Sequence, residues 1–117
     1  MLERYEEFQT VDKKELKDAA KFFKRAAKFL EKNRWTKGSY TKETKNGKFS
    51  YCAVGAMEEV SEQLGNRFAD FSDQYCENKY GITSTIGFND RKAKDKRYII
   101  RMFNAVAKEL ETKSKKK

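Results

Sequence analysis

The 117-residue chain contains no histidine and no proline, only two cysteines, and no long apolar run. The missing histidine excludes a Ser-His-Asp triad, a Cys-His pair, a histidine metal ligand and a histidine pH switch. Two cysteines are too few for a disulfide-rich scaffold or a four-cysteine zinc site. We therefore expect no metal and no cofactor, and most acid–base chemistry is excluded before any motif is considered.

The chain also lacks the roughly 18 consecutive apolar residues that a membrane-spanning helix needs. Its start contains Glu3, Glu6 and Glu7, where a signal peptide needs a basic and then an apolar stretch. We therefore expect no membrane association and a cytoplasmic location, in the host cytoplasm if a phage encodes the protein. In that compartment Cys52 and Cys76 are expected to be reduced thiols.

Charge and aromatic side chains are what the chain has in quantity. Charged residues make up 38% and aromatic residues 14%, and this aromatic content is enough to fill a core despite the charge. The length suits a single domain. We expect residues 1–112 to form one compact domain and residues 113–117 to form a flexible basic tail.

The net charge of +9 is unevenly spread along the chain. Residues 13–48 carry thirteen Lys or Arg against four Asp or Glu, whereas residues 49–90 carry two against seven. Residues from 91 onward are basic again, and half of their excess lies in the tail. Two basic segments around an acidic middle can present different faces to different partners.

Apolar residues at intervals of three and four predict a first helix over residues 13–33. Asp12 and Glu15 have the spacing of a capping box at its start. Further along, Asn46-Gly47 between short aromatic and threonine-containing stretches predicts a small β-hairpin, because this pair suits a tight hairpin turn.

The rest of the chain predicts three more helices. A second helix opens at Cys52 and ends near Leu64, with Gly65 as a stop, and a third spans about 67–79 between Asn66 and Gly81.

Residues 82–88 are expected to form a loop or one short strand, and the last helix runs over about 94–112. The predicted fold is mainly α, within the α+β class, with about four helices and one small hairpin.

Three short segments together resemble a small bacterial and phage domain family whose function is not established. They are Trp35-x-x-Gly38, then Tyr51-Cys52-Ala53-x-Gly55-Ala56-Met57, then Phe88-Asn89-Asp90 before an amphipathic helix. The resemblance spans residues 16–110, with Met57 where leucine is usual and Phe88 where tryptophan is usual. It implies a fold and a site around Cys52 and Asn89-Asp90, and it implies no activity.

The residues around that site allow two interpretations. Cys52 at a helix N-terminus has the position of a low-pKa thiolate, and Asp90 is its only candidate catalytic partner. The structural alternative makes Cys52 a small buried residue. Asn89 and Asp90 are likewise either ligand-binding residues or, in the interpretation that we favour, a cap for the last helix.

A lysine stripe on the first helix is the strongest functional pattern. Together with basic and aromatic residues that follow it, this stripe suits phosphate groups, and the aromatic residues suit stacking on bases. The alternative is a solvated helix face with Trp35 in the core. The candidate partner-binding residues are Lys17, Lys21, Lys24, Arg25, Lys28, Arg34, Trp35, Lys37 and Tyr40.

These patterns predict a small non-enzymatic binding or regulatory protein, of phage origin if the resemblance extends that far. Its partner is an acidic protein surface or a nucleic acid, which would meet the basic surfaces by electrostatic attraction. The alternative is an enzyme or small-ligand binder centred on Cys52 with Asn89-Asp90. Lysine outnumbers arginine 20 to 7, which favours phosphate contacts over base reading.

Overall fold

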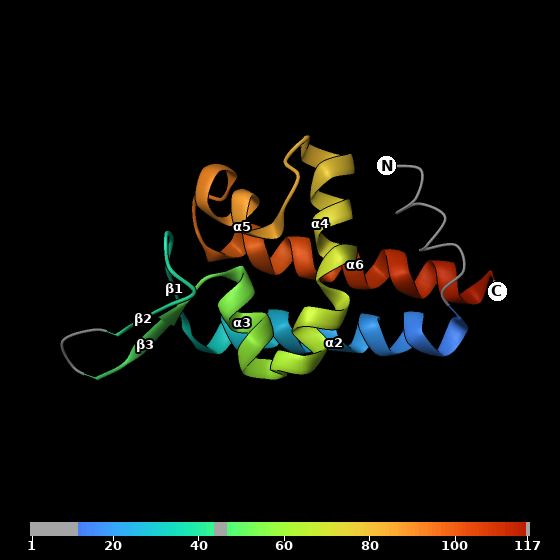
Figure 1. The fold of residues 1–117 in the computed structure, drawn as a ribbon, viewed down its shortest axis with the longest axis horizontal. Coiled ribbons are helices and arrows are strands. Elements are labelled where there is room, and N and C mark those ends of the chain that lie inside the picture. The colour runs from blue at the N-terminus through green and yellow to red at the C-terminus, as the bar shows by residue number, and fades with distance from the viewer. Residues whose placement is uncertain (1–11, 44–46, 117) are drawn as a thin grey trace.

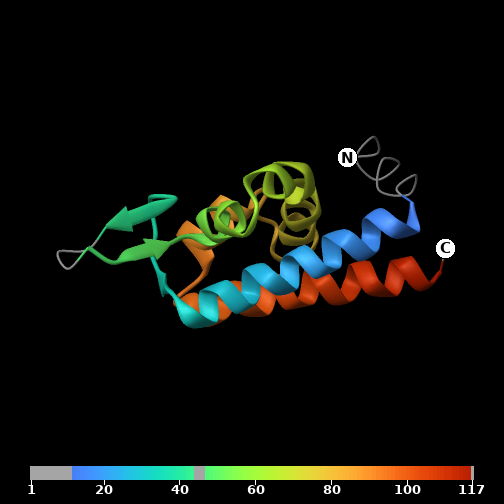
Figure 2. The same cartoon turned by 90° about the horizontal axis from the view of Figure 1, so that it is seen from below.

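The computed structural model describes residues 12–43 and 47–116. Its frame is an antiparallel pair of long helices, α2 (Lys13–Lys32) and α6 (Lys96–Lys115), which lie side by side along the molecule (Figures 1 and 2). Two further helices cross one side of this pair, and a small sheet lies at one end. The predicted class, mainly α with a small β element, is confirmed.

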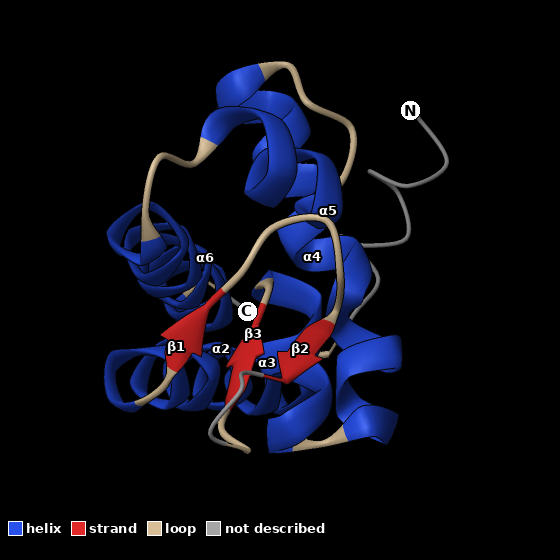
Figure 3. Ribbon diagram, turned by 90° about the vertical axis from the view of Figure 1, so that its left-hand side faces the viewer, coloured by secondary structure: helices blue, strands red, loops and turns tan. Residues whose placement is uncertain are grey.

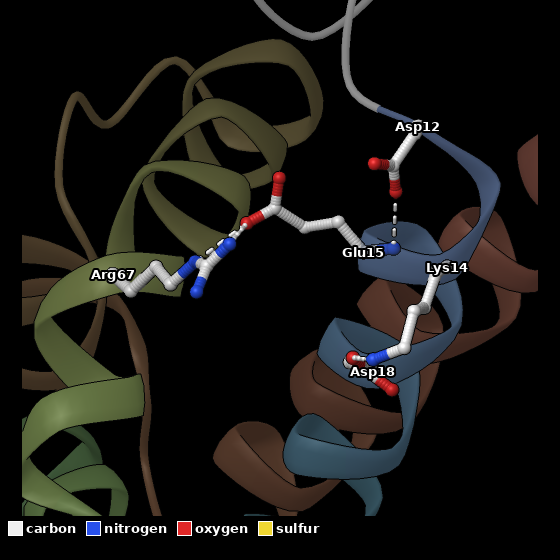
Figure 4. Close-up of polar contacts among 5 residues, drawn as sticks. All are labelled: Asp12, Lys14, Glu15, Asp18 and Arg67. Carbon is white, nitrogen blue, oxygen red and sulfur yellow. Dashed lines mark hydrogen bonds and ion pairs between the residues drawn. The ribbon is translucent and has the colours of Figure 1, made fainter.

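Helix α2 forms where the apolar stripe predicted it. The Asp12 side chain caps the helix by accepting a hydrogen bond from the backbone N–H of Glu15 at 2.8 Å. The capping box is only half formed, because the Glu15 carboxylate pairs with Arg67 on α4 (Glu62–Tyr80) instead of turning back to the cap (Figure 4). The buried residues of α2 are Leu16, Ala19, Ala20, Phe22, Phe23, Ala26, Ala27 and Leu30.

The predicted hairpin is confirmed by two antiparallel strands, β2 (Thr41–Glu43) and β3 (Phe49–Tyr51). Strand β1 (Arg34–Trp35) pairs in parallel with the other side of β3, so the strand order is β1-β3-β2 (Figure 3). We did not predict β1, because two residues are too few to show an alternating pattern. Asn46 lies outside the described residues, whereas Gly47 has the positive φ, 74°, that its place in the turn requires.

Helix α3 (Ala53–Val60) is separated from α4 by Ser61, and this break differs from the predicted one. The Ser61 hydroxyl accepts the backbone N–H three residues on at 3.2 Å and so caps α4. Gly65, the predicted stop, lies buried inside α4 against Met57, and Asn66, the predicted cap, is an exposed helical residue. A side-chain cap decides the break here, while Gly65 lies inside α4, where an added Cβ would make ordinary contact with Met57.

Gly81 ends α4 in the left-handed conformation, with φ 71°, as predicted. The following stretch, which we expected to be a loop or strand, contains one helical turn, α5 (Thr85–Gly87), followed by a π-helical turn, η1 (Phe88–Lys92). Ser84 caps α5 through its hydroxyl, which accepts a backbone N–H at 2.9 Å. Local capping therefore makes helical turns from a sequence that is rich in β-forming residues.

Helix α6 begins after Asp95, whose side chain accepts from the backbone N–H two residues on at 2.9 Å. It ends at Lys115, three residues beyond the predicted end. Ser114 is buried, and its hydroxyl donates to a backbone carbonyl one turn back at 2.7 Å. The part of the expected tail that extends from residue 113 to residue 115 is thus helical.

One hydrophobic core joins the long helix pair to α3 and α4. Its centre is aromatic: Phe22 meets Phe23 edge-on at 5.3 Å between ring centroids, and Phe68 and Phe103 pack beside them. No helix in residues 12–43 and 47–116 is both long and apolar enough to cross a membrane.

Candidate functional site

The three motif segments meet around Asn89, which is fully buried. Its Oδ1 accepts from the indole Nε1 of Trp35 at 2.6 Å and from the backbone N–H of Ala53 at 3.0 Å. Its Nδ2 donates to the Thr36 carbonyl at 3.2 Å and to the Asp90 carboxylate at 2.9 Å. We call these five residues the asparagine hub. It ties β1, the start of α3 and η1 into one unit.

Asp90 extends the hub to the loop before β2. Its Oδ1 also accepts from the backbone N–H of Gly38 at 3.0 Å. The hydrogen bonds from Asn89 and Gly38 stabilise the carboxylate and hold the pKa of Asp90 below its usual range. The prediction that Asn89 or Asp90 caps the last helix is therefore wrong: Asp95 is the cap, and both residues lie in η1, where they bind β1, the loop after it and the start of α3.

Cys52 is the N-cap of α3. Its Sγ accepts from the backbone N–H of Gly55 at 3.3 Å, and its own N–H donates to the Tyr40 carbonyl at 3.0 Å. A Cβ on Gly55 would collide with that same carbonyl, which explains the glycine at this position. Burial raises the pKa of the Cys52 thiol, and the hydrogen bond from Gly55 offsets this only in part.

This arrangement accounts for the motif residues without any chemistry. The Asn89 amide uses both of its donors and both acceptor positions within the asparagine hub, so this amide has no free position for a ligand. Cys52 is buried, and burial raises the pKa of its thiol, which is the opposite of what a nucleophilic thiolate needs. In the described part of the chain, no three Cys, Asp or Glu side chains are placed to hold a metal ion.

The predicted partner-binding residues separate into two surfaces. Lys17, Lys21 and Lys24 line a groove of about 320 Å³ between α2 and α6. The groove lies where α2 begins and α6 ends, which is far from the sheet in Figure 1. We call it the lysine groove, and its lining residues are Lys13, Lys17, Ala20, Lys21, Lys24, Glu111, Ser114 and Lys115.

The lysine groove holds more positive charge than its acids balance. Lys24 Nζ lies 3.0 Å from the Glu111 carboxylate. Lys13, Lys17 and Lys21 make no ion pair with any residue that the structure describes. These three follow one another at intervals of four residues on one helix face, where like charges repel. Among the described residues, the positive charge of these three lysines is therefore not balanced by ion pairs.

The second surface lies at the sheet end and includes Arg34, Trp35, Lys37 and Tyr40. Trp35 is half-buried, is hydrogen-bonded to the hub, and has Lys37 Nζ 5.6 Å from its ring centroid. It is therefore anchored, whereas Tyr40 is 51% exposed. Because β1 and the groove lie at opposite ends of the molecule (Figure 1), the structure does not bring these aromatic residues to the groove lysines.

Arg25 and Lys28 are exposed on α2 and do not line the groove. Lys115 and Glu111 do line it. We placed Lys115 in a flexible tail because the last helix was expected to end at residue 112, and we did not consider Glu111 as a site residue. The signal was present: Ser114 follows Leu110 by four residues and so continues the buried face of α6.

Fold and hub together define a small, mainly α-helical domain in which the motif residues fasten a three-stranded sheet to the helices. The chain belongs to DUF6197, a family of unknown function, whose model matches residues 15–109. The predicted resemblance to a domain family without an established function is thereby confirmed. A search of the curated proteins and a search of the solved structures found no match to the chain.

Proposed function

We propose that the protein is a non-enzymatic binding protein with a regulatory role, and that it engages an acidic partner through the lysine groove. The observation that carries this proposal is the concentration of Lys13, Lys17, Lys21 and Lys115 around one groove, to which the described residues contribute a single acid. Like charges one helical turn apart each cost a few tenths of a kcal/mol. A sequence that keeps such a local conflict commonly does so at a functional site.

The charge layout of the fold supports an encounter with an acidic partner. The acidic middle segment of the chain supplies α3 and α4, which cross one side of the long helix pair. Of its acids, none lines the groove. A concave surface of one sign raises the rate at which an oppositely charged partner arrives.

The alternative, an enzyme or small-ligand binder centred on Cys52 and Asn89-Asp90, receives no support from the geometry. Both the thiol and the amide are buried and already hydrogen-bonded. The buried thiol is not the accessible nucleophile that such an enzyme needs, and the Asn89 amide has no free hydrogen-bonding position for a ligand.

Elution from a heparin column tests whether the groove or the overall charge binds anions. We expect the Lys17→Gln/Lys21→Gln variant to elute at clearly lower salt than the native protein. The matched control, Lys79→Gln/Lys92→Gln, loses the same charge at two exposed lysines outside the groove, and should elute close to the native protein. Equal elution of the two variants would show that the groove has no special role and would contradict the proposal.

A further inference from the structure

The chemistry of the lysine groove distinguishes between the acidic partners that it could take. Its lining consists of lysine, alanine, glutamate and serine. These residue types are depleted in protein–protein interfaces, which are built on aromatic and apolar anchors. Lysine and serine, in contrast, commonly contact the sugar–phosphate backbone of nucleic acids.

The positions of the exposed aromatic residues also favour a nucleic acid over a protein partner. Those among the described residues are Tyr40, Phe49 and Tyr80, and none of them lines the groove. A protein partner would therefore find no hydrophobic anchor there. A phosphate chain needs none, because its affinity comes from the counterions that lysines release from it.

The spacing of the lysines fits a linear polyanion. Lys13, Lys17 and Lys21 succeed one another by one helical turn, or about 6 Å along the axis. This step is comparable with the distance between successive phosphates of an extended strand. Ala20 and Ser114, which also line the groove, are small and buried, so they add little bulk beside the lysines.

We infer that the lysine groove binds the phosphate backbone of a single-stranded nucleic acid without reading its sequence. This inference rests on the proposed function and names the chemistry of its partner. Neither arginine nor an aromatic side chain lines the groove in the described ranges, so the groups that read or stack on bases are missing.

Glu111 gives the inference a sharp test, because it is the groove's own competing anion. In the free protein its carboxylate forms an ion pair with Lys24 Nζ, at a distance of 3.0 Å. Replacing it, Glu111→Gln, frees a fifth lysine for phosphate. The matched control is Glu109→Gln, since Glu109 lies on the same helix, pairs with Lys113 at 3.4 Å, and does not line the groove. Both variants raise the net charge by one.

The experiment measures the dissociation constant of an oligothymidylate of about 12 nucleotides over a range of salt concentrations. With four open lysines, the native slope of log K against log salt should be about −3. Glu111→Gln should steepen this slope by about 0.7 and tighten binding about threefold to tenfold at low salt. Glu109→Gln should change the affinity less than about twofold, and Lys21→Gln should flatten the slope by about 0.7.

The following result would overturn the inference. If Glu111→Gln and Glu109→Gln behave alike, the nucleic acid does not occupy the groove. Thermal unfolding of each variant checks that the fold is kept, and Lys21→Gln repeats the test in the opposite direction.

A poly-glutamate peptide of equal charge separates this inference from the proposed function. If the peptide binds as tightly as the oligonucleotide and responds to Glu111→Gln in the same way, the phosphate assignment fails and the proposed function stands. If neither probe binds and heparin retention does not depend on the groove lysines, both fail.

Discussion

The two ends of this molecule treat polar groups in opposite ways. At the sheet end, the asparagine hub pairs every polar atom of a buried amide. At the other end, the lysine groove leaves most of its charges without a partner in the described chain. Buried polar groups that are fully paired stabilise a unique fold, whereas unpaired charge that faces solvent is available for binding. The recognisable motif therefore has a role in the fold, and the site that we propose lies at the other end of the molecule.

The strongest way to break this comparison is to remove the hub amide. Asn89→Ala leaves the Trp35 indole and the Ala53 N–H buried without an acceptor, so we expect a loss of about 3–5 kcal/mol in the free energy of unfolding. Urea denaturation measures this loss. Asn104→Ala, on the exposed face of α6, is the control and should change stability by less than about 0.5 kcal/mol. A hub variant as stable as that control would refute the structural role of the motif.

Substitutions at two glycines should give the next largest changes in stability. Gly55→Ala should cost about 1–3 kcal/mol, because its new methyl group collides with the Tyr40 carbonyl that also accepts from Cys52. Gly65→Ala should be neutral or stabilise the protein by up to about 1 kcal/mol, because its methyl group would lie 3.4 Å from the Met57 backbone, in ordinary contact, inside a helix. Thermal melts of the two variants compare these effects directly. Equal destabilisation would mean that the collision with the Tyr40 carbonyl does not set Gly55 apart from Gly65.

Cys76, the second cysteine, tests whether the core is as well buried as the asparagine hub. Burial raises the pKa of Cys76 to about 12, from the usual 9.0. The folded state therefore keeps a proton that the unfolded state releases, so the free energy of unfolding should fall as the pH rises from 9.0 toward 12. We expect a loss of about 1 kcal/mol between pH 8 and pH 10, measured by urea denaturation, and a smaller loss in Cys76→Ala. If the free energy of unfolding of Cys76→Ala depends on pH as steeply as that of the native protein, the raised pKa of Cys76 is contradicted.

The smallest expected effect lies at the lysine groove and has the opposite sign. Lys21→Gln removes a repulsion with Lys17 and should raise the free energy of unfolding by about 0.2–0.5 kcal/mol at low salt. The gain should vanish at high salt, because exposed charges are then screened. Lys79→Gln, at the end of α4, is the control and should show no such gain. A loss of stability in Lys21→Gln would show that the groove lysines support the fold.

Local patterns predicted the elements that depend on local physics. The apolar stripe of α2, the Asp12 cap, the hairpin and the Gly81 stop are each determined by residues a few positions apart. The division of α3 from α4 was predicted wrongly because Gly65 has two possible uses, and only the contact with Met57 shows that it packs inside a helix.

The site depended on contacts that no local pattern contains. The bond from Asn89 to Trp35 joins residues 54 positions apart, so a motif that looked chemical could not be recognised as structural. The groove required a further fact, that Lys115 lies beside the start of α2, which follows only from the antiparallel packing of the two long helices. The sequence alone predicted the lysine stripe on α2, but it did not predict that the end of α6 forms the other side of the groove.

The antiparallel pairing of α2 and α6 has one more consequence. Lys13 and Lys115 line the same groove, so the described chain enters and leaves the fold at one place. A domain whose ends meet in this way can be inserted into a loop of another protein without being stretched. It also means that an affinity tag fused near residue 13 or residue 115 would stand beside the groove lysines. Fusion proteins and tagged versions of this chain will therefore report on binding only when the added segment carries no charge of its own.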